Sequence, residues 1–132
     1  MAHPHKDTRL AKFISKRIIE LKGIKSQAEI AAQAGFTNAN FLSMLKSGAS
    51  KLPIDRVPDF ARALDSDPAL VLRLALEQQL GPVAARAVYE LLGSPISKNE
   101  RAWIAELRDA SDDNDPNLTK KSRAALRAIF GK

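Results

Sequence analysis

Glycine and proline divide this chain into segments that each have the length of a short helix. Gly23, Gly35 and Gly48 separate the early segments, and a Gly81-Pro82 junction separates two later ones. Because glycine ends helices and proline is tolerated in their first turn, the spacing predicts helices near 7–21, 26–34, 37–46, 53–64, 68–80, 82–92, 97–110 and 118–130. Alanine and leucine greatly outnumber the β-branched residues, which favours helix over strand. We therefore expect an all-α protein.

The patterns within these segments agree with helices. In the first segment, apolar residues such as Leu10, Ile14 and Ile18 recur at steps of three and four, as on one side of an amphipathic helix. Ser26 with Glu29 has the spacing of a capping box, in which each side chain bonds the other residue's backbone N–H. Ser97 and Glu100 repeat that spacing before the seventh segment.

Composition excludes several classes of function. The chain contains no cysteine, so it forms no disulfide, zinc finger or thiol nucleophile. Its two histidines, His3 and His5, lie near the N-terminus, where we expect a mobile tail and no metal site. With no histidine elsewhere and no phosphate-binding glycine loop, we expect no catalytic residues, no cofactor and no enzyme. The sequence has no long apolar run, so we expect a soluble, cytoplasmic protein without membrane association.

Charge is distributed unevenly along the chain. The formal net charge is +6 and the isoelectric point is about 9.8. Residues 1–52 hold nine lysines and arginines against three acids, whereas 53–92 are net acidic and 93–132 only weakly basic. The whole excess of positive charge therefore lies in the first three segments, and we expect a polyanion such as nucleic acid to bind there.

The second and third segments have the pattern of a helix-turn-helix. A short capped helix is followed by Gly35 and by a helix over 37–46, with Thr37 as its expected N-cap. At 100° per residue, one side of that helix collects its apolar anchors, Phe41, Met44 and Leu45. The other side collects Ala39, Leu42, Ser43 and Lys46, and Asn38 and Asn40 flank this outward side near the start of the helix. Asparagine, serine and small apolar side chains are suited to base edges in the major groove. The alternative is an ordinary polar helix start in which the asparagines act as local caps.

At this point the sequence resembles a known family. SQAEIAAQAGF at 26–36, FLSMLK at 41–46, KLPIDRVP at 51–58 and ARAL at 61–64 are similar to the XRE-type, lambda-repressor-like DNA-binding proteins of bacteria and phages. The likeness covers about residues 7–80. It implies a five-helix helix-turn-helix domain whose third helix enters the major groove.

The resemblance also implies roles for individual residues. Gln27 would contact a DNA phosphate and support the recognition helix, and Lys46 and Lys51 would contact the DNA backbone. The base edges would be met by Asn38, Ala39, Asn40 and Ser43. Together with Thr37, these are the candidate DNA-binding residues, and they imply a bacterial or phage transcription regulator.

We expect two domains, the DNA-binding domain at 1–80 and a helical extension at 81–132. Members of the family commonly bind as dimers, so the resemblance implies a homodimer on an inverted-repeat operator in double-stranded DNA, with the extension as the natural contact. The competing hypothesis is a protein-interaction module, such as an antitoxin or antiactivator, that holds a partner protein. The concentration of charge in residues 1–52 favours DNA.

Overall fold

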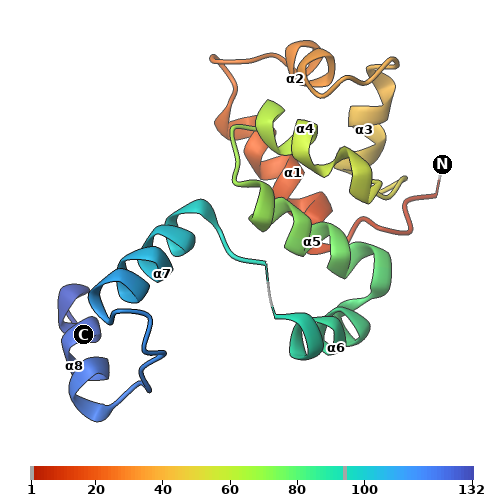
Figure 1. Cartoon of the computed structure of the whole chain (residues 1–132). Helices are drawn as coiled ribbons and strands as arrows, with labels where there is room; N and C mark the ends of the chain where they lie inside the picture. Colours follow the sequence, from red (N-terminus) through yellow and green to blue (C-terminus); the bar gives the residue numbers. More distant parts are fainter. Residues whose placement is uncertain (1, 94) are drawn as a thin grey trace. The chain divides into compact units, whose positions relative to one another are not determined.

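The computed structural model describes residues 2–93 and 95–132, and these residues form helices without any strand (Figure 1). This confirms the expected all-α class. The α-helices are α1 (Arg9–Glu20), α2 (Gln27–Gln33), α3 (Asn40–Ser47), α4 (Val57–Ala63), α5 (Pro68–Leu80), α6 (Pro82–Leu92), α7 (Lys98–Ala110) and α8 (Lys120–Ile129). A short 3₁₀ turn, η1 (Ile54–Arg56), precedes α4.

The chain divides into two compact units, residues 1–98 and 99–132. The first unit extends past the expected domain end at residue 80, because α6 packs on α5. Tyr89 of α6 donates a hydrogen bond from its hydroxyl to the carbonyl oxygen of Arg73, at 3.0 Å. Partial burial, with the nearby carboxylate of Glu77, raises the pKa of this hydroxyl, so Tyr89 keeps the proton that it donates.

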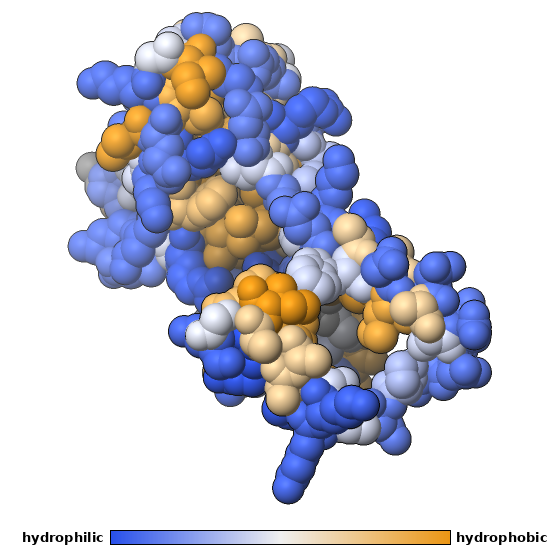
Figure 2. Space-filling view, turned by 90° about the vertical axis from the view of Figure 1, so that its left-hand side faces the viewer, coloured by the Kyte–Doolittle hydropathy of each residue, from blue (hydrophilic) through white to orange (hydrophobic). Residues whose placement is uncertain are grey.

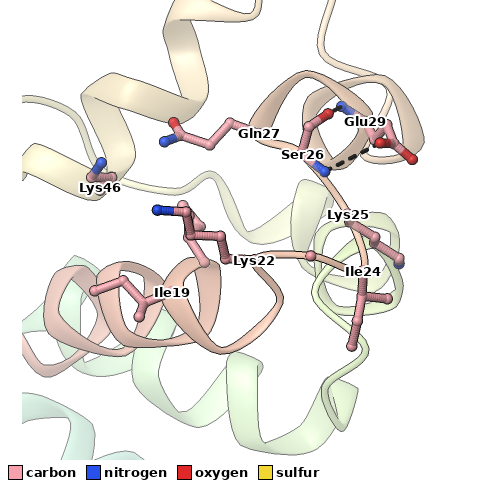
Figure 3. A pocket seen from close by; sticks show the side chains of 10 residues that line it. Ile19, Lys22, Ile24, Lys25, Ser26, Gln27, Glu29 and Lys46 are labelled. Carbon is pink, nitrogen blue, oxygen red and sulfur yellow. Dashed lines mark hydrogen bonds between the residues drawn. The ribbon is translucent and has the colours of Figure 1, made fainter.

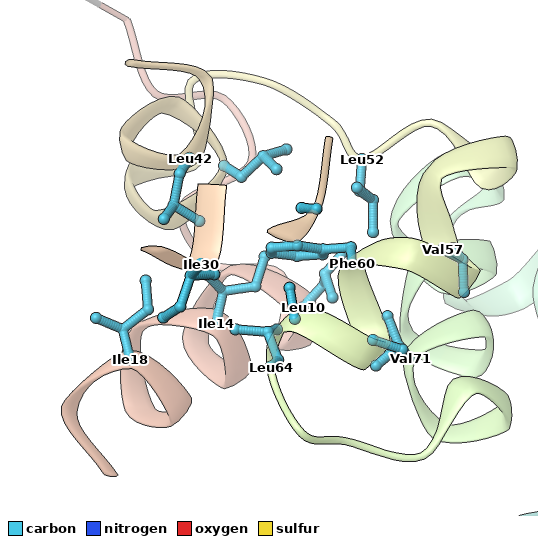
Figure 4. Close-up of a cluster of buried hydrophobic side chains, with 14 of the residues drawn as sticks. Leu10, Ile14, Ile18, Ile30, Leu42, Leu52, Val57, Phe60, Leu64 and Val71 are labelled. Carbon is cyan, nitrogen blue, oxygen red and sulfur yellow. The ribbon is translucent and has the colours of Figure 1, made fainter. Parts of the chain in front are cut away.

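One hydrophobic core holds α1 to α5 together (Figure 4). The ring of Phe60 is fully buried, and the core side chains of the other helices surround it. The large side chains that are fully buried with it come from α1, α2, α3 and α5, from the C-cap of α4 and from the loop before η1; they are Leu10, Ile14, Ile30, Leu42, Leu45, Leu52, Leu64 and Val71. Burying each such side chain contributes about 1.5–3 kcal/mol, so this core is what fixes α2 and α3 in place.

Local sequence signals set the starts of several helices. The capping box at α2 is confirmed, because Ser26 Oγ accepts from the Glu29 N–H at 3.1 Å and the Ser26 N–H donates to Glu29 Oε1 at 3.2 Å. At α5, the Asp67 carboxylate accepts from the N–H groups of the first turn. The expected helix over 53–64 is divided into η1 and α4, with Pro58 in the first turn of α4, where its missing N–H costs little.

Two cations of the first unit bind the C-terminal end of α4. Arg17 Nε donates to the carbonyl oxygen of Leu64 at 2.7 Å, and Lys25 Nζ donates to that of Ala63 at 2.9 Å. Lys25 also pairs with the Asp65 carboxylate at 3.0 Å. These groups satisfy carbonyl oxygens that have no partner within the helix. Part of the positive charge of residues 1–52 therefore stabilises the fold itself. A count of charges along the sequence does not reveal this.

A polar side chain inside the core joins three segments of the chain. Gln78 of α5 is 7% exposed. Its Oε1 accepts from the Leu52 N–H at 2.9 Å, and its Nε2 donates to Thr8 Oγ1 at 3.1 Å. Thr8 Oγ1 in turn caps α1 by accepting from the Ala11 N–H. Gln78 thus ties the start of α1 and the loop after α3 to α5.

Replacing this side chain tests its contribution to stability. We expect Gln78→Ala to lower the free energy of unfolding by about 1–3 kcal/mol, because the buried Leu52 N–H loses its acceptor. Urea denaturation followed by circular dichroism measures the change. Gln33→Ala, at an exposed position of α2, is the control and should change stability by less than about 0.5 kcal/mol. Equal stability of the two variants would contradict the role given to Gln78.

Candidate nucleic-acid interface

The turn between α2 and α3 is held by aromatic contacts. Gly35 has a φ of 75°, a left-handed conformation that glycine adopts without strain. The next N–H, of Phe36, donates to the Ala31 carbonyl oxygen at 3.0 Å. The Phe36 ring lies 5.0 Å from the ring of Phe41 and 5.5 Å from that of Phe60, centroid to centroid. The turn is therefore fixed to α3 and to α4 at once.

The helix after this turn begins later than expected. We predicted a helix over 37–46 with Thr37 as N-cap, but α3 begins at Asn40, and its N-cap is Ala39, which makes no side-chain cap. The reason is a competing local bond, since Asn38 Oδ1 accepts from the Asn40 N–H at 2.9 Å. Asparagine side chains commonly stabilise turns in this way. Thr37 to Ala39 consequently belong to the turn.

The outward side of α3 is narrower than predicted. Leu42, which we placed on that side, is 1% exposed and belongs to the core. The physical reason is that α3 contacts both α1 and α2, so apolar side chains on two adjoining sides are covered. The contact with α1 includes a hydrogen bond from Ser15 Oγ to the Lys46 carbonyl oxygen at 3.2 Å. The exposed side chains of α3 are those of Asn40, Ser43, Lys46 and Ser47.

All eight candidate residues are exposed, namely Gln27, Thr37, Asn38, Ala39, Asn40, Ser43, Lys46 and Lys51. Their polar atoms are not equally available. Asn38 uses its carbonyl oxygen in the turn, whereas within the described residues the Asn40 amide and the Ser43 hydroxyl have no side-chain hydrogen bond. Lys51 lies in the loop between α3 and η1. Among the candidate side chains of α3 itself, the Asn40 amide and the Ser43 hydroxyl are thus the uncharged polar groups that are available for contact with another molecule.

A hollow of about 640 Å³ lies between the end of α1, the start of α2 and Lys46 of α3. In Figure 3 the side chains of Lys22 and Gln27 reach into it toward Lys46, whereas Lys25 turns away toward α4. Two ammonium groups and an amide from three elements therefore surround one space. Lys22 was not among the predicted residues, although its position just before the glycine that ends the first helix is visible in the sequence.

The segment before α1 lies against the end of α3. The His5 N–H donates to the Gly48 carbonyl oxygen at 2.8 Å, and His5 is half-buried. The expectation of a mobile tail there is therefore wrong for His5. Gly48 ends α3 in the left-handed conformation, with φ of 83°, and the backbone of His5 and Lys6 crosses directly over its Cα. This crossing brings the exposed Lys6 to the C-terminal end of α3.

A scan against models of protein families, a search of characterised proteins and a search of solved structures each found no match to this chain. Among the described residues, no group of three or more histidine, aspartate or glutamate side chains is placed to hold a metal ion. In the same part of the chain, no helix has both the length and the apolar character to cross a bilayer.

Proposed function

We propose that this protein binds double-stranded DNA in a sequence-specific manner and regulates transcription, with α3 in the major groove. The main observation in support of this proposal is that two features lie next to each other on adjoining elements. One is an exposed helix side with uncommitted amide and hydroxyl groups, and the other is a cluster of cations beside it. The first is suited to bases and the second to phosphates.

Asn40 and Ser43 are the side chains proposed to read bases. They lie three residues apart on α3, so they share one side of the helix. An asparagine amide donates to N7 and accepts from N6 of adenine, and a serine hydroxyl serves as donor or acceptor. Both are available because no described residue bonds their side chains. Asn38 and Ala39 are proposed to lie close to the bases at the start of the helix, Asn38 with one carbonyl lone pair already in use.

Lys22 and Lys46 are each proposed to bind a phosphate group at the hollow that they surround with Gln27, whose amide is proposed to contact one of these phosphates. No ion pair involves either lysine within the described residues. Lys51, exposed in the loop after α3, is proposed to contact a third phosphate. Such contacts set the position and affinity of a protein on DNA without reading its sequence.

The order of the elements supports the resemblance noted in the sequence. We propose that α1 to α5 correspond to the five helices of a lambda-repressor-like domain, with α2 and α3 as its helix-turn-helix. We further propose that the protein acts as a homodimer on an inverted repeat, because one α3 reads only a few base pairs and a genome offers about 10⁶–10⁹ competing sites.

Base contacts and phosphate contacts can be separated by experiment. Selection from random duplexes with the purified protein would first define a preferred site. We expect Asn40→Ala and Ser43→Ala each to weaken binding to that site by about 1–3 kcal/mol per half-site while non-specific binding stays nearly constant. Lys46→Ala should weaken binding to all sequences to a similar degree. Fluorescence anisotropy with matched specific and scrambled duplexes measures both.

The control is Gln33→Ala, an exposed amide on α2 that does not lie on the α3 surface. It should bind the selected site as the parent does. If both Asn40→Ala and Ser43→Ala bind that site as tightly as the parent, the assignment of α3 as the recognition helix is wrong. Failure to bind any duplex would instead reject DNA as the partner.

A further inference from the structure

Three cations of α1 have no part in the proposed function. Of the nine lysines and arginines in residues 1–52, three are proposed phosphate contacts, two bind carbonyl oxygens at the end of α4, and Lys6 lies at the C-terminal end of α3. The remaining three are Arg9, Lys12 and Lys16. All three line one depression of about 350 Å³ between α1 and α5, the α1/α5 groove. The positive charge that DNA binding leaves unexplained is therefore gathered in one place.

The floor of the α1/α5 groove is apolar. It is formed by Phe13 of α1 with Leu70 and Leu74 of α5. Phe13 and Leu70 are half-buried and pack against the core, and Leu74 is only 4% exposed, so the floor is recessed below the cations. Figure 2 shows one face of the molecule, on which apolar areas are bordered by hydrophilic side chains. An apolar floor inside a charged rim is the composition of a protein–protein interface.

The cations of the groove form a row. Arg9 is paired with Glu77 of α5 at 3.6 Å, but its side chain stays 65% exposed. Lys12 and Lys16 are exposed, and within the described residues neither forms an ion pair. The three cations follow one another at steps of three and four residues, so they share one side of α1. From Arg9 to Lys16 the helix rises about 10.5 Å. Positive charge therefore runs beside the apolar floor for about two helical turns.

We propose that the α1/α5 groove binds an acidic amphipathic helix of another protein. Such a helix lays apolar side chains, spaced by three or four residues, into an apolar groove. Aspartates and glutamates at the same spacing beside them then meet Arg9, Lys12 and Lys16, because one helix matches the repeat of another. The inference goes beyond DNA binding and does not depend on it, since α3 contributes no residue to this groove.

The shape and chemistry of the groove disfavour other anionic partners. A small ligand is usually enclosed over most of its surface, whereas this groove is wide open to solvent. A bilayer takes up apolar side chains that protrude into it, and this floor is recessed. Single-stranded nucleic acid stacks its bases on successive aromatic rings, but the one ring that lines the groove, Phe13, is packed against the core. A duplex backbone would satisfy the cations and leave the apolar floor without a partner.

Selection from a display library of helical peptides, randomised on one side without bias of charge, tests the proposal on the full chain. We expect enrichment of sequences with apolar residues at i, i+3 or i+4 and i+7 and with acids beside them. Changing the apolar anchors of an enriched peptide to serine should abolish its binding. Amide chemical shifts measured by NMR should change along α1 and α5. The proposal would be overturned if no acidic amphipathic sequence is enriched, or if the shifts change on other helices.

Charge reversal on the full chain locates the contact. Lys12→Glu with Lys16→Glu should weaken binding of an enriched peptide about 30-fold or more, because like charges then face each other. A peptide whose acids are changed to lysine should bind this variant better than it binds the parent. Lys120→Glu with Lys121→Glu is the matched control, since it changes the net charge equally at exposed positions of α8, and it should leave the peptide affinity nearly unchanged. Equal effects of the two double variants would show that only net charge attracts the peptide, and the proposal would fail.

Competition separates this groove from the proposed DNA surface. In the variant Lys22→Ala with Lys46→Ala, we expect weaker duplex binding, an unchanged peptide affinity and no displacement of the peptide by duplex. Displacement that is as strong as in the parent would assign the groove to nucleic acid. Binding of anionic vesicles, or self-association, that Lys12→Glu with Lys16→Glu abolishes would assign the groove to lipid or to a second copy. Each of these three results would overturn the proposal. A chain that binds the peptide but no duplex would reject the proposed function alone and support this one.

Discussion

Raising the salt concentration from 50 to 200 mM is expected to weaken binding to duplex DNA by about 10³-fold. Lys22, Lys46 and Lys51 give each copy three exposed cations near α3, so a dimer places six on phosphates. Each neutralised phosphate releases condensed counterions, and the logarithm of the affinity falls with the logarithm of the salt concentration at about 0.9 per contact. Anisotropy titrations across that salt range measure the slope.

Single substitutions check which cations contribute to this slope. Lys22→Ala or Lys46→Ala should reduce it by about two in a dimer, one contact from each copy. Arg86→Ala removes the same charge from an exposed position on α6 and should leave the slope unchanged. If affinity is the same at both salt concentrations, phosphate contacts do not hold the complex. Equal effects of all three substitutions would show that only net charge matters.

Gly48→Ala is expected to lower the free energy of unfolding by about 2–5 kcal/mol, from strain in the left-handed conformation and overpacking. The φ of Gly48 is 83°, and an added Cβ would overlap the backbone of His5 and Lys6. Backbone cannot move aside as a flexible side chain can. Thermal and urea denaturation measure the loss, and the His5 backbone amide, which donates to the Gly48 carbonyl oxygen, should lose protection from hydrogen exchange.

Gly35→Ala separates the two causes of this loss. Gly35 also has a positive φ, of 75°, but the nearest atom to an added Cβ is the guanidinium of Arg56 at 3.9 Å. This variant therefore carries the conformational strain alone, about 1–2 kcal/mol. The difference between the two variants measures the crossing of the N-terminal segment over α3. Equal destabilisation would mean that this segment does not press on Gly48 in solution.

Sequence patterns predicted those parts of the fold that depend on neighbours in the chain. The capping box of Ser26 and Glu29 involves atoms three residues apart, and the structure contains it. The left-handed glycines after α2 and α3 follow from the same local rules. The prediction of Thr37 as N-cap was wrong for a local reason too. The Asn38 side chain accepts the hydrogen bond of the Asn40 N–H, and the helix begins after it. The residue types of Thr37 and Asn38 alone do not show which of the two side chains forms the local hydrogen bond.

Contacts between segments far apart in the chain could not be predicted from the sequence patterns. Leu42 was assigned to the outward side because a helical projection supposes one covered side, whereas α3 is covered by two helices. Arg17 and Lys25 were counted as general positive charge, but they bind carbonyl oxygens at the end of α4. No sequence pattern distinguishes the buried Gln78 from its neighbour Gln79. Lys22 joins the candidate interface only because the turn after α1 lies beside the start of α2 and Lys46 of α3.

The position of Phe36 has a consequence for how operators would be discriminated. Its ring joins the turn before α3 to Phe41 and to Phe60 of the core, so α3 has little freedom to tilt. If α3 reads bases as proposed, it cannot adjust to an imperfectly placed base. A mismatch of shape must then be absorbed by the nucleic acid, through bending or a change of groove width. The energy of such deformation depends on base steps that no side chain contacts. Under the proposed function, the flexibility of an operator's untouched central steps becomes part of what this protein recognises.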